Sequence, residues 1–186
     1  MIKLVVGLGN PGKEYQDNRH NLGYKVIDEL TKRKRKRLKE GKGDYFFCQV
    51  ESEERELLLI KPSVFMNMCG WVVLDCLADF DMSPEDLLVL CDDINLPLGM
   101  IRIRESGSDG GHKGLRSIIY QLNTLNFARL RMGVGMPEQE MDLEDYVLED
   151  FKEDELETKE EMIKQAADAI EYTFAFGIKE AMNKYN

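Results

Sequence analysis

The sequence predicts a single-domain α/β sandwich of three layers, in which helices flank a twisted, mixed and mostly parallel sheet. Short runs of β-branched and aliphatic residues, the pattern of buried strands, alternate along the chain with amphipathic stretches of helical period. Strands that alternate with helices favour a sheet covered by helices on both faces. The length of 186 residues, without an internal repeat, fits one domain over residues 1–186.

Elements in the first half follow from where apolar runs begin and end. Strands are expected at residues 2–6, 45–50, 57–60 and 87–91, because each is an aromatic or aliphatic run bounded by glycine or charged residues. An amphipathic helix is expected from residue 23 and leads into a basic run. A second helix is expected at 68–80, where Trp71, Leu74 and Leu77 recur at helical spacing, and residues 83–86 indicate a helix start or tight turn.

The second half continues the alternation. Residues 100–104 alternate apolar and basic side chains, which predicts a strand with one solvent-exposed face. Glycine and serine indicate a flexible loop at 105–111. A helix at 113–122 and a strand at 130–134 follow. The chain then predicts a short helix at 143–151, within an acidic segment near 138–151, and one long C-terminal helix over 153–186.

Charge is segregated along the chain. The formal net charge is −10, and residues 138–160 hold twelve acids and two lysines, so the remainder is close to neutral. Within that remainder lies the basic run Lys32 to Lys39, and Arg102, Arg104, Arg116, Arg129 and Arg131 surround the polar motifs. A local basic face for phosphate is therefore compatible with the acidic total. The acidic segment is expected to be a solvated face that points away from any nucleic acid.

Composition also indicates the cellular compartment and the kinds of site to expect. The four cysteines lie in apolar contexts without C-x-x-C pairing, which favours reduced core thiols in a cytoplasmic protein over disulfides. No apolar run reaches the length of a membrane helix, and no secretory signal is expected at the N-terminus. With two histidines and scattered cysteines, we expect neither a metal site nor a cofactor.

The most informative segment is the exit of the first strand. The glycine-rich run Gly7-Leu8-Gly9-Asn10-Pro11-Gly12 is followed by Arg19-His20-Asn21 at the start of a helix. Ligands in open α/β sheets bind beyond the carboxyl ends of strands. His20 titrates near neutral pH when unperturbed, so it is a candidate general base, although a solvated structural histidine is the safer interpretation of His20 alone.

A base of this kind needs an acid on its other ring nitrogen, and Asp93, after the buried strand at 87–91, is expected to supply it. Turn capping is an equally good interpretation of Asp92 and Asp93. No Gly-x-Ser-x-Gly elbow is present, so hydrolysis would use water. The amides of Asn10 and Asn67 suit stabilisation of carbonyl charge, with turn chemistry for Asn10 and helix capping for Asn67 as the alternatives.

Two further motifs have competing interpretations. The run Gly7 to Gly12 satisfies the dinucleotide-binding pattern G-x-G-x-x-G, but Pro11 removes a backbone donor and no second strand ends in an acid about twenty residues on. Gly110-Gly111-His112-Lys113-Gly114 opens a helix whose amides and Lys113 could receive an anion. His112 is expected to be structural, because only Asp109 is an obvious acid beside it.

Five segments in order resemble the motifs of the bacterial-type peptidyl-tRNA hydrolase family, and together they cover essentially the whole chain. The first is the glycine-rich run with Tyr15 and Arg19-His20-Asn21. The others are Lys61-Pro62-Ser63-Val64-Phe65-Met66-Asn67, Asp92-Asp93-Ile94-Asn95-Leu96-Pro97-Leu98-Gly99, Gly110-Gly111-His112-Lys113-Gly114-Leu115-Arg116-Ser117-Ile118 and Phe127-Ala128-Arg129-Leu130-Arg131-Met132-Gly133-Val134-Gly135.

The resemblance implies hydrolysis of the ester between peptide and tRNA, which would free tRNA from stalled or aborted translation. His20 would be the base, Asp93 its orienting acid, and Asn10 would help to separate N-blocked from free aminoacyl-tRNA. Family members commonly have Asn where this chain has Lys113, which puts that substrate contact in question. The remaining implied binding residues are Tyr15, Phe65 and Asn67 for the peptide or 3′ end, and Arg104 and Arg131 for tRNA phosphate. The resemblance also implies that the acidic segment near 138–151 forms a lid-like helix beside the cleft.

The expected partner is peptidyl-tRNA, bound by a monomer without membrane contact. A catalytically idle RNA-binding relative is an alternative, and the retained His20, Asp93, Asn10 and Asn67 argue against it. A dinucleotide-binding Rossmann-type enzyme is the alternative from another class. Whether Lys32 to Lys39 contacts RNA is left open by the sequence.

Overall fold

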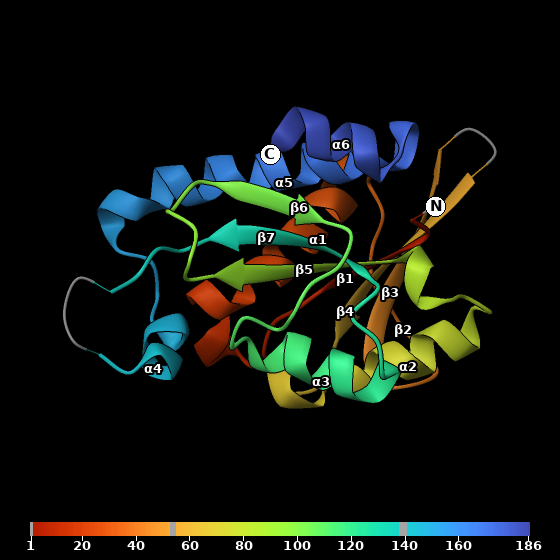
Figure 1. Cartoon of the computed structure of the whole chain (residues 1–186), viewed down its shortest axis with the longest axis horizontal. Coiled ribbons are helices and arrows are strands. Elements are labelled where there is room, and N and C mark those ends of the chain that lie inside the picture. Colours follow the sequence, from red (N-terminus) through yellow and green to blue (C-terminus); the bar gives the residue numbers. More distant parts are fainter. Residues whose placement is uncertain (1, 53–54, 138–140) are drawn as a thin grey trace.

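The computed structural model describes residues 2–52, 55–137 and 141–186, which form one seven-stranded sheet in the order β2-β3-β4-β1-β5-β7-β6 (Figure 1). Four neighbouring strands are parallel: β4 (Arg55–Pro62), β1 (Leu4–Gly7), β5 (Leu87–Asp93) and β7 (Ala128–Gly133). The antiparallel strands lie at the edges: β2 (Lys39–Glu40), β3 (Tyr45–Ser52) and β6 (Ile101–Arg104). The predicted mixed, mostly parallel sheet is confirmed.

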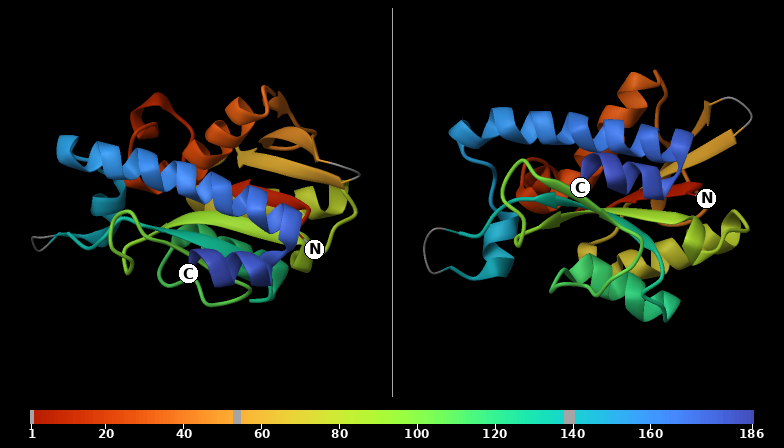
Figure 2. Two further views of the ribbon diagram at one scale, coloured as in Figure 1. Left: turned by 90° about the horizontal axis from the view of Figure 1, so that it is seen from above. Right: turned by 45° about the horizontal axis from the view of Figure 1, so that its top comes forward.

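Helices cover both faces of the sheet, as predicted. One face carries α1 (Leu22–Arg33), α5 (Leu156–Phe176) and α6 (Ile178–Tyr185), and the other carries α2 (Cys69–Asp79) and α3 (Lys113–Leu122) (Figures 1 and 2). The short helix α4 (Leu143–Leu148) lies beyond the carboxyl ends of β5 and β7. Single 3-10 turns are η1 (Lys13–Tyr15), η2 (Arg19–Asn21), η3 (Met66–Met68), η4 (Pro84–Asp86) and η5 (Glu153–Glu155).

The sheet separates two apolar cores, and side chains alternate between them along each strand. On β5, Leu88 and Leu90 pack with α1 and α5, whereas Leu87, Val89 and Cys91 pack with α2 and α3. Both faces are fully covered, so residues 87–91 of the strand are all apolar, as expected of a buried parallel strand. This alternation decides which way the polar residues at the end of β5 point.

Three boundaries differ from the sequence-based expectations. The predicted single C-terminal helix is wrong, because Gly177, with φ of 90°, separates α5 from α6. The basic run leaves α1 after Arg33 and then forms β2, which was not predicted. Helix α4 begins at Leu143 as predicted but ends at Leu148 and not at residue 151, and residues 138–140 of the predicted lid-like segment lie outside the described residues.

Two compositional expectations can be compared with the structure. All four cysteines are buried and free, and burial raises the pKa of the Cys91 thiol, so the prediction of core thiols is confirmed. Within the residues that the structure describes, no helix has both the length and the apolar character needed to cross a membrane.

Candidate active site

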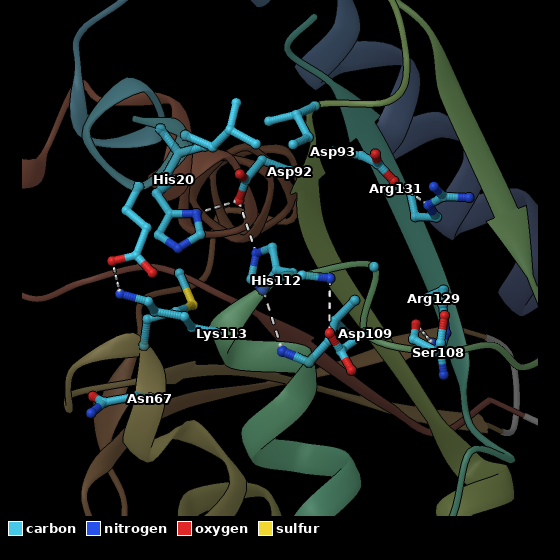
Figure 3. A pocket seen from close by; sticks show the side chains of 18 of the residues that line it. His20, Asn67, Asp92, Asp93, Ser108, Asp109, His112, Lys113, Arg129 and Arg131 are labelled. Atoms are coloured by element: carbon cyan, nitrogen blue, oxygen red, sulfur yellow. Dashed lines mark hydrogen bonds and ion pairs between the residues drawn. The ribbon is translucent and has the colours of Figure 1, made fainter. Parts of the chain in front are cut away.

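A cleft of about 730 Å³ opens beyond the carboxyl ends of the parallel strands, next to α4. Figure 3 shows part of its lining. Its walls come from the turn after β1, from η2 and η3, from the end of β5, from the loop before α3, from β7 and from α4. All nine residues that the sequence singled out line this cleft: Asn10, Tyr15, His20, Phe65, Asn67, Asp93, Arg104, Lys113 and Arg131.

Close packing between β1 and α1 brings His20 to the sheet. A Cβ on Gly7 would lie 2.3 Å from the Gly23 carbonyl oxygen, and a Cβ on Gly23 would lie 2.6 Å from the carbonyl oxygen of Leu90. Glycine at both positions lets the start of α1 rest directly on β1 and β5. His20, in the 3-10 turn just before α1, is thereby held at the end of β5 with only 7% of its surface exposed.

The acid that contacts His20 is Asp92, and the prediction that Asp93 does so is wrong. His20 Nδ1 lies 2.8 Å from Asp92 Oδ1 (Figure 3). Side chains alternate along β5, so Asp92 follows Leu88 and Leu90 to the face that carries α1, where His20 lies. Asp93 is directed to the opposite face.

Asp93 has a structural environment of its own. Its Oδ2 forms an ion pair with Arg131 Nε on β7, and its Oδ1 accepts a hydrogen bond of 2.8 Å from the Asn95 backbone amide. The turn-capping interpretation is therefore right for Asp93, and only Asp92 is available to orient the histidine.

His112 is a second histidine on the same carboxylate, a contact that no sequence pattern indicated. Its Nε2 lies 3.0 Å from Asp92 Oδ1, and its ring centroid lies 4.7 Å from that of His20. Its Nδ1 caps α3 by accepting hydrogen bonds from the backbone amides of Gly114, at 3.1 Å, and Leu115, at 3.3 Å. The structural role expected for His112 is thus present together with a direct contact to the acid.

These contacts determine where the protons lie. Because His112 Nδ1 accepts from two backbone amides, the proton of the neutral ring lies on Nε2, which donates to Asp92. Asp92 as a carboxylate can only accept, so His20 Nδ1 also donates to it. The Nε2 of a neutral His20 therefore keeps its lone pair, as a general base requires.

Asp92 stays ionised in this environment. Burial disfavours the carboxylate, but the charges and hydrogen bonds of His20 and His112 outweigh burial and hold the pKa of Asp92 below its usual range. The group of His20, Asp92 and His112 also brings three metal-ligating atoms within 4.8 Å of one another. A metal on His112 Nε2 would, however, place the ring proton on Nδ1, against the two amides that Nδ1 caps, so the geometry suits a hydrogen-bonded acid–base group.

Amide and aromatic side chains form one end of the cleft. The Met66 backbone amide donates to Asn10 Oδ1 at 2.8 Å, which orients the Asn10 Nδ2 donor for use in the cleft. Asn67 is exposed inside η3 and caps no helix, so the helix-capping alternative for it is wrong. Tyr15 and Phe65 meet edge to face, with ring centroids 6.2 Å apart.

Arginines form the other end. Figure 3 shows Asn67 on one side of His112 and Arg129 and Arg131 on the other. Arg104 also lines this end, on β6 beside β7. Arg129, which we did not predict as a site residue, is buried and donates to four backbone carbonyls, including those of Gly107 and Ser108. It therefore holds the loop that leads to His112, and its spacing of two from Arg131 was the signal that could have identified it.

The acidic segment contributes side chains to the cleft. Glu144 and Asp145 of α4 line it, and Glu144 forms an ion pair with Lys113, so these two acids do not belong to a purely solvated face. Glu155 is not merely solvated, because it pairs at 2.6 Å with the buried Arg19 beside His20. No sequence signal pointed to this contact, whose partners are 136 residues apart.

Known proteins are similar to this chain over its whole length. The family model described as peptidyl-tRNA hydrolase matches residues 4–186. Curated peptidyl-tRNA hydrolases are similar over the full chain: that of Alkaliphilus oremlandii is 44% identical with all of both chains covered, and that of Rhodopirellula baltica is 43% identical with 100% of this chain and 97% of the relative covered. A crystal structure of peptidyl-tRNA hydrolase from Acinetobacter baumannii superposes with a TM-score of 0.93 at 31% identity, covering 100% of this chain and 94% of the other. The chain belongs to the peptidyl-tRNA hydrolase family.

Proposed function

We propose that this chain hydrolyses the ester bond between a peptide and the 3′ ribose of tRNA and so frees tRNA for translation. The observation that carries the proposal is the hydrogen-bonded group of His20, Asp92 and His112, which leaves His20 Nε2 free at the cleft. Asn67 lies on one side of His112 and Arg129 and Arg131 lie on the other (Figure 3). That arrangement suits a substrate with a peptide at one end and phosphates at the other.

The chemistry follows from the positions of the protons. His20 takes a proton from water as the water oxygen attacks the ester carbonyl, and Asp92 stabilises the imidazolium that forms. The Asn10 amide donates to the carbonyl oxygen as charge develops there. His20 then returns the proton to the departing 3′ oxygen. Burial that raises the pKa of Cys91 argues against a cysteine nucleophile at this strand end.

The two ends of the substrate are assigned by chemistry. Tyr15, Phe65 and Asn67 offer aromatic surface and an amide for the peptide or the 3′ end. Lys113 can donate a hydrogen bond but cannot accept one, and it must exchange its contact with Glu144 to do so. Arg104 and Arg131 suit tRNA phosphates, because guanidinium groups bind phosphate through paired hydrogen bonds.

Selectivity between N-blocked and free aminoacyl-tRNA is the experiment that tests this proposal. We expect N-acetyl-aminoacyl-tRNA to be cleaved and the free form largely spared, since a charged α-amino group would lose its hydration beside Asn10. Release of the labelled amino acid from both substrates, at equal concentration, measures the ratio. Equal rates would indicate a general esterase, absence of hydrolysis would favour the idle RNA-binding relative, and tight dinucleotide binding would favour the Rossmann-type enzyme.

The arginine end gives a second prediction. Arg104→Ala and Arg131→Ala should each raise the KM for tRNA substrates and reduce the salt dependence of log KM by about one unit of slope per lost phosphate contact. A minimal substrate without the tRNA body is the control and should respond to neither change. If both variants match the parent at moderate salt, phosphate is bound elsewhere, and Lys32 to Lys39 would be tested next.

Part of the basic run from Lys32 to Lys39 is already paired with acidic side chains of α1 and α5. Arg33 pairs with Glu29, Asp168 and Glu171, and Lys34 also pairs with Glu171. The run begins at Lys32 in the last turn of α1, about 15 Å along the helix axis from the start of α1 beside His20. We therefore regard the basic run as secondary to Arg104 and Arg131 in phosphate binding.

His112 offers a prediction that separates two of its roles. His112→Asn should retain the helix cap, because asparagine is a favourable capping residue, but should lose the donor to Asp92. We expect kcat to fall about tenfold while the melting temperature stays within a few degrees, whereas His112→Ala should lose activity and also about 1 kcal/mol of stability. Full activity of His112→Asn would show that His112 serves only as a cap.

We also propose that the enzyme works as a monomer in the cytoplasm, with residues 141–151 as a lid beside the cleft. The buried, reduced thiols support a reducing compartment. The lid assignment is supported by the α4 residues that line the cleft, and by the anchoring of the segment after α4 on Arg19, which donates to the carbonyls of Glu149 and Asp150.

A further inference from the structure

Three exposed apolar side chains follow one another from the cleft onto helix α2, outside the catalytic group. Phe65, Met68 and Trp71, here called the α2 strip, are 56%, 47% and 52% exposed. They follow one another at intervals of three residues through η3 and the first turn of α2. Other residues of α2, such as Val73 and Cys76, supply its contacts with the core, so the strip is not required for packing of the helix.

The α2 strip is continuous with the peptide end of the cleft. Phe65 lines the cleft and contacts Tyr15, whereas Met68 and Trp71 lead out of it along the helix. The arginines lie on the far side of His112 from Asn67, which belongs to the same turn as Met68 (Figure 3). Helix α2 contains Asp75 and Asp79 and no lysine or arginine, so its surface does not suit phosphate.

We propose that the α2 strip is an extended subsite for the peptide part of the substrate, holding the residues that precede the esterified one. This inference rests on the proposed function. Aromatic rings and a flexible thioether bind apolar and backbone surface of many sequences, which suits a substrate of variable sequence. The strip spans one 3-10 turn and one α turn, about 10 Å, which matches about three residues of extended peptide.

The test measures how KM depends on peptide length. Substrates carry the same tRNA and the same esterified residue, with an N-acetyl group or with one to five further residues. For the parent protein, KM should fall over about the first three added residues and then level off. Trp71→Ala should raise the KM of the four-residue substrate about five- to tenfold, the size of one aromatic contact, and that of the N-acetyl substrate less than twofold. The kcat of Trp71→Ala should equal that of the parent for both the four-residue and the N-acetyl substrate.

Tyr120→Ala is the matched control, because Tyr120 is 78% exposed on α3 and does not line the cleft. It should alter no KM. If Trp71→Ala affects long and short substrates equally, or affects neither, the subsite is refuted. A monomer–dimer equilibrium in sedimentation that Trp71→Ala abolishes would also refute it, by assigning the strip to a second copy of the chain.

Fluorescence reports occupancy directly, because Trp71 is the only tryptophan in the sequence. The ligands are peptides joined by a stable amide to 3′-amino-3′-deoxyadenosine. A four-residue ligand should shift Trp71 emission to shorter wavelength, and an N-acetyl-aminoacyl ligand should leave it unchanged. Unchanged emission with every bound ligand would overturn the subsite. A parent that binds the ligands with this shift but hydrolyses no peptidyl-tRNA would instead overturn the proposed function.

Discussion

His20→Ala should lower hydrolysis of N-acetyl-aminoacyl-tRNA by about 100- to 10,000-fold, the usual contribution of a positioned general base. The substitution removes the one ring nitrogen whose lone pair is left free at the cleft once Asp92 and the cap of α3 have fixed the other protons. The effect should fall on kcat, because the peptide and phosphate contacts proposed above involve other residues. Single-turnover rates of the variant and the parent measure it.

The controls for His20→Ala concern folding and binding. His112 keeps its contacts with Asp92 and with the amides of Gly114 and Leu115, so the start of α3 should stay intact. The variant should therefore melt within a few degrees of the parent and bind uncharged tRNA with unchanged affinity. Retention of full turnover by His20→Ala would overturn the mechanism proposed here.

The sequence predicted most of the fold because its elements are locally marked. Apolar strands bounded by glycine or charge, amphipathic helices and the wet face of β6 all carry their own signals. The break at Gly177 was missed, because α5 and α6 are both helical and only one glycine with positive φ separates them. The contact of Arg19 with Glu155 was missed because it joins distant segments whose proximity depends on the finished fold.

The candidate site was predicted in composition but not in its central pair. The interior of β5 is apolar on both faces, so the residues at 87–91 give no alternation from which to tell whether Asp92 or Asp93 faces α1. Only the packing of Leu88 and Leu90 against α1 settles the direction. The role of His112 could not be predicted either, because His112 precedes α3 and its partner Asp92 lies at the end of β5, so only the finished fold brings the two together.

That distinction yields the second prediction: Asp92→Asn should lower kcat about a hundredfold or more, whereas Asp93→Asn should leave kcat within about threefold. An asparagine at position 92 offers one acceptor and one donor to two histidines that both donate. The cap of α3 holds the His112 tautomer, so His20 must be the ring that changes. Its Nδ1 would then accept from the asparagine, and its proton would move to Nε2, where the base is needed.

Asp93→Asn instead weakens an ion pair with Arg131, so its effect should fall on the KM for tRNA and on its salt dependence.

The pH profile adds a further check on Asp92. Because His20 and His112 outweigh burial and hold the pKa of Asp92 below its usual range of about 3.9, this carboxyl remains charged when the pH falls from 8 to about 5. Asp92 should therefore contribute no titration step of its own to the parent's pH profile in that interval, and a carboxyl carbon resonance of Asp92 that titrates there would contradict this. Equal losses for the two variants at pH 8 would mean that neither aspartate alone orients His20.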